Sequence, residues 1–145
     1  MTLKEIGEGI IIDQTKIETI KKLDSIVFDC DGVLIDVSNS YDLAIKKTVD
    51  FIIKEMAQIN EPGLVTTKLI EGFKASGGFN DEIDVTYALI LAIVAAKKRN
   101  EPFSNFVPKV IANADQTGIN SVEKYLNTLD VDVSDIRKKL AYPST

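Results

Sequence analysis

Two aspartates separated by one residue, Asp29 and Asp31, are the side chains in this sequence that are best suited to chemistry. They lie in the segment IVFDCDGVLID, residues 26–36. One carboxylate can attack phosphorus or bind a cation, while its neighbour passes a proton to a leaving oxygen. Gly32 accepts torsions closed to other residues, so the chain can curl and bring both side chains to one site. The spacing predicts phosphoryl transfer assisted by Mg²⁺, a hard cation that prefers oxygen ligands.

The plainer interpretation of the same residues is a turn. Asp and Gly are the common residues of turns, so Asp29, Asp31 and Asp36 around Gly32 could be structural. The uniformly apolar run Ser25 to Phe28 before them favours the site, because it is typical of a buried parallel strand. Acidic residues that follow such a strand lie at the carboxyl end of the strand, which is where open α/β sheets bind their ligands.

A hydrophobic strand followed by Asp-x-Asp-Gly-x-Leu-x-Asp resembles the first motif of the haloacid dehalogenase superfamily. The resemblance implies that Asp29 is a nucleophile that forms a phosphoaspartate and that Asp31 is the general acid/base. It also implies that Mg²⁺ is held by the side chain of Asp29 and the backbone carbonyl of Asp31, with a small phosphorylated metabolite as the substrate. The same fold could direct Asp29 at a carbon–halogen bond, but the second acid, Asp31, favours phosphate.

Two longer stretches, DGVLIDVSNSYDLAIKKTV and SGGFNDEIDVTYAL, are similar to a subfamily of hypothetical phosphatases with a helical cap. The resemblance implies that Asn39 to about Leu140 is this cap, inserted just after the first motif. The candidate substrate-binding residues are then Gly32, Asn39, Gly77, Gly78, Phe79 and Asn80. For residues 77–80 an ordinary turn between helices, with Asn80 as N-cap, is the open alternative.

The elements that must position these residues follow from periodicity and capping. Gly9 to Asp13 reads as a strand and Thr15 starts a short helix. Helices are predicted to begin near Asn39, Thr66, Asn80, Ser104, Asn120 and Ser134. The expected buried stripe of the helix after Asn80 consists of Ile83, Tyr87, Ile90, Leu91 and Val94. The fold class is therefore α/β: the start of a Rossmann-like core of one or two strands, then a mostly α-helical cap bundle.

This predicts three parts: residues 1–37 as the N-terminal part of the core, 38–141 as the cap and 142–145 as a connection. The superfamily's later motifs, a phosphate-binding Ser or Thr, a Lys and further acids, are not recognisable after the helices. We expect the chain alone to be inactive, as a truncation, a proteolytic fragment or half of a split gene. Its apolar run 25–29 needs a second chain or a second copy to complete the sheet. The alternative is a non-catalytic helical interaction module that keeps the acidic turn as structure.

The composition of the chain limits the kinds of site and the location that it can have. The net charge of −5 disfavours a nucleic-acid surface, and the absence of histidine excludes a histidine base or metal ligand. Cys30 is the single cysteine, which is expected to pack inward and has no partner for an internal disulfide. The longest apolar run, residues 88–96, is far shorter than the roughly 20 residues that span a bilayer. We expect a cytoplasmic protein without a membrane span, whose lysine clusters are solvated.

Overall fold

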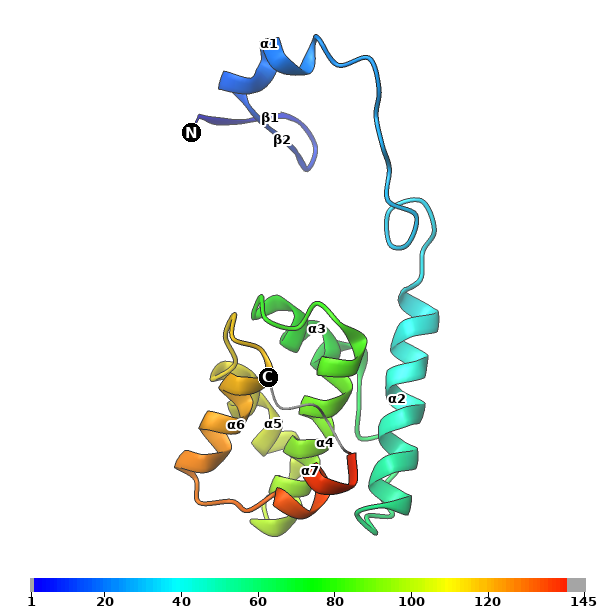
Figure 1. Cartoon of the computed structure of the whole chain (residues 1–145), viewed down its shortest axis with the longest axis vertical. Helices are drawn as coiled ribbons and strands as arrows, with labels where there is room; N and C mark the ends of the chain where they lie inside the picture. Colours follow the sequence, from blue (N-terminus) through cyan, green and yellow to red (C-terminus); the bar gives the residue numbers. More distant parts are fainter. Residues whose placement is uncertain (1, 141–145) are drawn as a thin grey trace. The chain divides into compact units, whose positions relative to one another are not determined.

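The structure, a computed structural model, describes residues 2–140, except for the side chains of Ser38 and Asn39. The chain forms two compact units, Met1–Asp36 and Val37–Thr145. The described residues contain two strands, one short 3₁₀-helix and seven α-helices (Figure 1). Across these residues no helix combines the length and the apolar content needed to cross a bilayer. The fold is thus mixed α and β.

The first unit begins with a hairpin of two antiparallel strands, β1 (Leu3–Gly7) and β2 (Ile10–Asp13). The 3₁₀-helix η1 (Gln14–Lys16) and the short helix α1 (Ile17–Ile20) follow. Asp13 is the N-cap of η1, because its Oδ1 accepts a hydrogen bond from the backbone N–H of Thr15 at 3.0 Å. The predicted strand at residues 9–13 and the short helix after Thr15 are confirmed. The sequence did not predict β1.

The strand predicted for Ser25 to Phe28 is wrong for this chain. These residues have no regular secondary structure, and Ile26, Val27 and Phe28 are 75%, 95% and 61% exposed. A strand exists only when a neighbour accepts and donates its hydrogen bonds. The sheet of the described residues contains β1 and β2 alone, so the apolar run has no neighbour to pair with. The structure therefore contains no parallel strand at these residues, and its described sheet is the antiparallel hairpin of β1 and β2.

The second unit is entirely helical in its described part. All six helices predicted for it are confirmed, and each begins within two residues of its predicted start. They are α2 (Ser38–Glu55), α3 (Thr67–Ala75), α4 (Glu82–Lys98), α5 (Phe103–Ala112), α6 (Ile119–Thr128) and α7 (Ser134–Leu140).

Two details of α4 differ from the prediction. Its N-cap is Asp81 and not Asn80, because Asp81 Oδ1 accepts the backbone N–H of Ile83 at 2.7 Å. Ile83, expected in the buried stripe, is 64% exposed. Once the helix starts at Glu82, Ile83 lies in its first turn.

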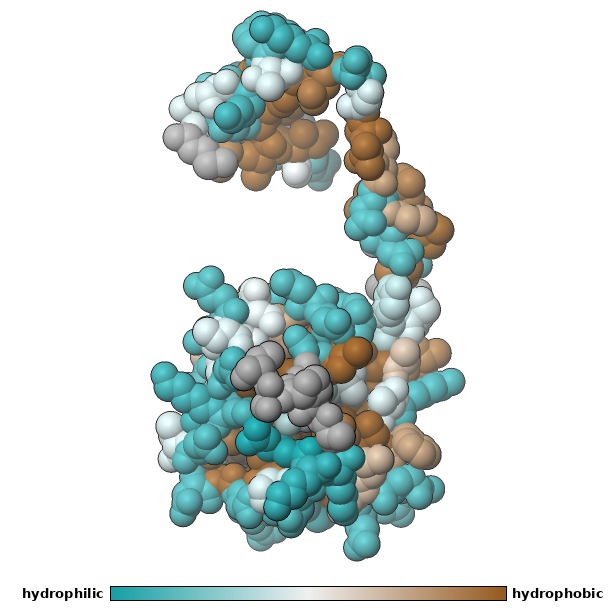
Figure 2. Space-filling view, viewed as in Figure 1, coloured by the Kyte–Doolittle hydropathy of each residue, from teal (hydrophilic) through white to brown (hydrophobic). Residues whose placement is uncertain are grey.

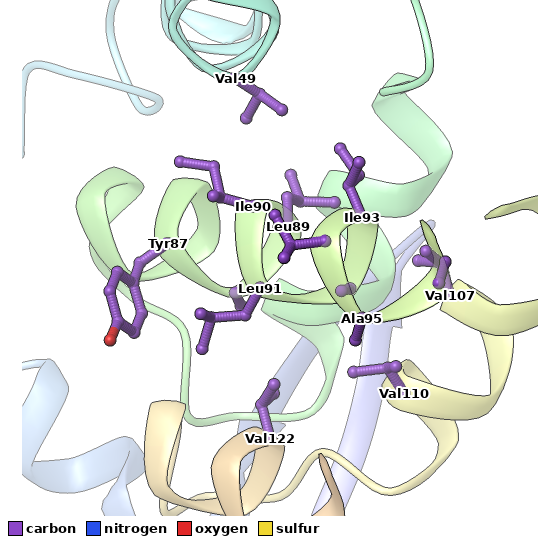
Figure 3. Close-up of a cluster of buried hydrophobic side chains, with 14 of the residues drawn as sticks. Val49, Tyr87, Leu89, Ile90, Leu91, Ile93, Ala95, Val107, Val110 and Val122 are labelled. Atoms are coloured by element: carbon purple, nitrogen blue, oxygen red, sulfur yellow. The ribbon is translucent and has the colours of Figure 1, made fainter. Parts of the chain in front are cut away.

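Helix α4 is the centre of the second unit. Every residue from Tyr87 to Ala96 is buried, so the helix is apolar on all sides. A helix of this kind must be enclosed by other elements. Figure 3 shows α4 with side chains from three other helices around it: Val49 from α2, Val107 and Val110 from α5, and Val122 from α6. The unit therefore covers its own core.

Candidate functional site

The acidic segment forms a closed turn. The carbonyl oxygen of Cys30 accepts hydrogen bonds from the backbone N–H groups of Leu34 and Ile35, both at 2.9 Å. The N–H of Gly32 donates to the carbonyl oxygen of Ile35 at 2.8 Å, and Asp31 and Ile35 form an isolated bridge. Gly32 has φ of +77°, in the left-handed region. The predicted curl after Asp29, with Gly32 as the residue that permits it, is confirmed.

Both aspartates are exposed at this turn. Asp29 Oδ1 accepts the backbone N–H of Cys30 at 2.8 Å, which holds its carboxylate at the start of the turn. Cys30 is also exposed, so the expectation that it packs inward is wrong. The apolar strand that should bury it is not formed. The geometry suits both interpretations from the sequence, because a closed turn presents the two carboxylates and is also ordinary structure.

The chemistry of the donors fits Mg²⁺. Carboxylate and carbonyl oxygens are its preferred protein ligands, and Asp29 and Asp31 supply both types within three residues. Within residues 2–140 no group of three or more acidic, histidine or cysteine side chains is close enough to hold a metal ion. The turn thus offers two carboxylates of a possible magnesium site.

The other candidate residues belong to the second unit or lie outside the description. The side chain of Asn39 is outside the described residues. Gly77 is exposed with φ of +85°, and Asn80 is exposed. Phe79 is 0% exposed, and its ring centroid lies 5.0 Å from that of Phe73. The prediction that Phe79 faces the substrate is therefore wrong, because its ring fills the core.

Gly78 has a packing role. A Cβ atom on Gly78 would overlap the backbone of Asp115 and Gly118, and one on Gly118 would lie 2.6 Å from the carbonyl oxygen of Gly78. The loop between α3 and α4 therefore crosses the loop between α5 and α6 backbone to backbone. No side chain fits at Gly78, so the glycine is explained without a ligand.

The loop after α5 is held by its own hydrogen bonds. Asp115 Oδ1 accepts the backbone N–H and the hydroxyl of Thr117, which lowers the pKa of Asp115. The buried Ser121 hydroxyl donates to the carbonyl oxygen of Gly118 at 2.6 Å and accepts the N–H of Asp115 at 3.2 Å. This loop fixes the position of Gly118 beneath Gly78.

A small polar cluster joins α4, α6 and α7. Tyr87 Oη lies 3.5 Å from Glu123 Oε1, and Arg137 Nε lies 3.1 Å from the same oxygen. Burial of Tyr87 raises the pKa of its hydroxyl, which therefore stays protonated at neutral pH. The sequence did not predict this cluster, since the three residues are far apart in the chain.

The sequence also did not predict a groove between α2 and α4. It has a volume of about 320 Å³, and its walls are largely apolar, with Tyr41, Ile45, Ile52, Ile83, Ile90 and Leu140 among the lining residues. Tyr41, one of the lining residues from α2, is 38% exposed. Periodicity assigns such residues to one helix face, but it does not tell whether a neighbouring helix fills the space beside them.

Comparisons with known proteins add no relative to this description. Neither models of protein families, nor curated proteins, nor solved structures give a match to the chain. Its function is therefore argued from its own residues.

Proposed function

We propose that this chain carries the nucleophile and the acid/base of a magnesium-dependent phosphatase of the haloacid dehalogenase kind. The observation that carries the proposal is the closed turn after Asp29 in the segment IVFDCDGVLID, with Gly32 at φ of +77°. The turn directs two exposed carboxylates to solvent, where a phosphorylated metabolite could reach them. The proposal places the protein in the cytoplasm, where such metabolites are found.

The chemistry proposed for the turn has two steps. A carboxylate oxygen of Asp29 attacks phosphorus, the bond from phosphorus to the ester oxygen breaks, and Asp31 gives its proton to the departing alkoxide. Water then attacks the aspartyl phosphate while Asp31 accepts its proton, which releases inorganic phosphate. Mg²⁺, held by the side chain of Asp29 and the carbonyl of Asp31, supplies positive charge against the phosphoryl oxygens when bound.

This chain alone is proposed to be inactive or nearly so. Transfer of a phosphoryl group depends on cationic and hydroxyl groups that stabilise its equatorial oxygens. The sequence after the helices contains no recognisable counterpart of the motifs that supply them. A second chain or a second copy is the proposed source of the missing surroundings.

Calorimetric titration with Mg²⁺ and beryllofluoride, a mimic of the phosphoryl group, tests the proposal. We expect binding that is lost in Asp29→Asn and kept in the control Asp24→Asn, which alters an exposed aspartate five residues earlier. Absence of heat with the unchanged chain, or equal binding by both variants, would count against the phosphatase. Hydrolysis of p-nitrophenyl phosphate at ordinary enzyme rates, abolished by Asp29→Asn, would overturn the proposed inactivity.

The second candidate function is a helical interaction module. It is favoured by one observation: the second unit encloses its own core around α4 and leaves an apolar groove of about 320 Å³ between α2 and α4. In that case the acidic turn is only structure. A chain that shows no Asp29-dependent binding of beryllofluoride would support the module.

A further inference from the structure

The exposed apolar surface of this protein is concentrated in its first unit. Among the described residues, twelve large apolar side chains of residues 2–36 are at least 46% exposed, against three in the second unit. Figure 2 shows hydrophobic atoms at the surface of the segment between α1 and α2. Large apolar patches that stay exposed in a single chain are typical of surfaces that bind another protein. The first unit is therefore the part of the chain in which an association surface is sought.

One part of this segment, residues 24–29, differs from the closed turn that follows it. Within residues 2–140 no backbone hydrogen bond involves the amides or carbonyls of Asp24 to Asp29. The segment carries three apolar side chains in a row, Ile26, Val27 and Phe28, which is the composition of a strand. Unpaired strand-like backbone is a template for pairing with another chain.

We propose that a second copy of this chain pairs with it through residues 25–29, antiparallel about a two-fold axis at Val27. In a symmetric antiparallel pair each residue lies opposite the one equally far on the other side of the axis. Val27 then faces its own copy, and Ile26 faces Phe28 in both directions. The Ser25 hydroxyl, which donates to Asp24 Oδ1 at 3.0 Å in the single chain, then faces the Asp29 carboxylate and can donate to it instead.

The charges select this register. An axis at Ile26 would place the Asp24 carboxylate against the ring of Phe28, and an axis at Phe28 would place Asp29 against Val27. Parallel pairing in register would align Asp24 with Asp24 and Asp29 with Asp29, and like charges opposite each other destabilise a sheet. Only the axis at Val27 pairs apolar with apolar residues and polar with polar ones.

The exposed apolar side chains of the first unit can be compared with what a stable pair needs. A standard interface removes about 800 Å² per partner from water. Twelve large side chains, each at least 46% exposed, are the apolar groups that such an interface would cover. Leu3, Ile6, Ile10 and Ile11 of the hairpin belong to the same unit and are available to cover the paired segment.

Intermolecular disulfides test the register. Directly opposed residues of an antiparallel pair have Cα atoms about 4.5–5.5 Å apart, within the range that a disulfide bridges. With Cys30→Ser removing the native thiol, Val27→Cys is expected to form a dimeric disulfide with oxidised glutathione at least tenfold faster than two control variants. The controls are Ile26→Cys, whose own copy is diagonal to it, and Ile83→Cys, an exposed apolar residue of the second unit. Equal rates for Val27→Cys and Ile26→Cys would overturn the register.

Sedimentation equilibrium of the unchanged chain tests the pairing itself. We expect a dimer that dissociates in Val27→Asp, while the helical circular dichroism stays unchanged, because Val27 is 95% exposed in the single chain. A monomeric unchanged chain, or a Val27→Asp dimer of equal affinity, would overturn the proposal. The inference does not rest on the proposed phosphatase, since Asp29-dependent binding of beryllofluoride is measured separately and either result can fail alone.

Discussion

Gly78 and Gly118 touch through their backbones, although forty residues separate them. A Cβ atom on Gly118 would lie 2.6 Å from the carbonyl oxygen of Gly78, and one on Gly78 would overlap the backbone nitrogen of Gly118. Because the contact is between backbone atoms on both sides, no flexible side chain can move aside to make room for a methyl group. The contact fixes the loop between α3 and α4 on the loop between α5 and α6.

Gly78→Ala is expected to lower the free energy of unfolding of the second unit by about 3 kcal/mol, the upper part of the range for overpacking. Urea unfolding followed by circular dichroism measures it. The matched control is Gly77→Ala, which has φ of +85° but nothing within 4 Å of the added methyl group. It should cost about 1–2 kcal/mol, from backbone strain alone. Equal losses for the two variants would contradict the close contact.

Phe79→Ala is expected to destabilise the second unit by about 3–5 kcal/mol, because it removes a fully buried ring and leaves a cavity. Thermal or urea unfolding checks this value. Phe51→Ala serves as the control, since Phe51 is 62% exposed and its truncation should change stability by about 0.5 kcal/mol or less. If Phe79→Ala leaves stability unchanged and weakens ligand binding, its assignment to the core is wrong.

Gly32→Ala is expected to open the acidic turn. An alanine at φ of +77° costs roughly 1–2 kcal/mol in the left-handed region, and nothing within 4 Å opposes the methyl group itself. Amide hydrogen exchange of Leu34 and Ile35, whose N–H groups donate to Cys30, should become several-fold faster than in the unchanged chain. Gly63→Ala, with a similar φ of +75° in the second unit, is the control and should leave both amides unaffected.

The pH dependence of stability should contain a contribution from Glu101. Lys109, which donates to its carboxylate, is the main cause that lowers the pKa of Glu101, and Arg99 adds to it. A carboxyl whose pKa is lowered in the folded state stabilises the fold above the unfolded value of about 4.3 and loses this contribution as the pH falls through the folded pKa. Glu101→Gln should thus lower the Tm at pH 7 and have a smaller effect at pH 3.

Gln116→Glu is the control for Glu101→Gln, because it alters the charge at an exposed position. Its effect on the Tm should be small at both pH values. A Tm difference for Glu101→Gln that is the same at pH 7 and pH 3 would show that the loss does not come from ionisation.

The helices could be predicted because their causes are local. The apolar spacing of α2 and the polar caps before α4 lie within the helix itself or next to it. Such local signals locate the start of each helix to within two residues. The choice between Asn80 and Asp81 as N-cap could not be made, since both are good capping residues. The curl at Gly32 could likewise be predicted, because a left-handed turn is encoded by one glycine.

The failures involve contacts that the local pattern of the sequence does not determine. The run from Ser25 to Phe28 has the composition of a strand, but a strand needs a neighbour, and the chain supplies none among its described residues. Phe79 looked free to face a ligand because it lies in the loop after α3, and the sequence pattern does not tell that its ring packs back onto Phe73 of that helix. Gly78 looked like a phosphate-binding glycine because the backbone of Gly118 that excludes a side chain is forty residues away.

The division of the chain at residues 36 and 37 also separates its optical signals. All four tyrosines, Tyr41, Tyr87, Tyr125 and Tyr142, follow the division, and the sequence has no tryptophan. Tyrosine emission therefore reports on the second unit alone and is blind to whether the first has folded or paired. A tryptophan introduced at Phe28 would give the first unit a fluorescence of its own, so that the folding of one unit and the association of the other could be followed at two wavelengths in one sample.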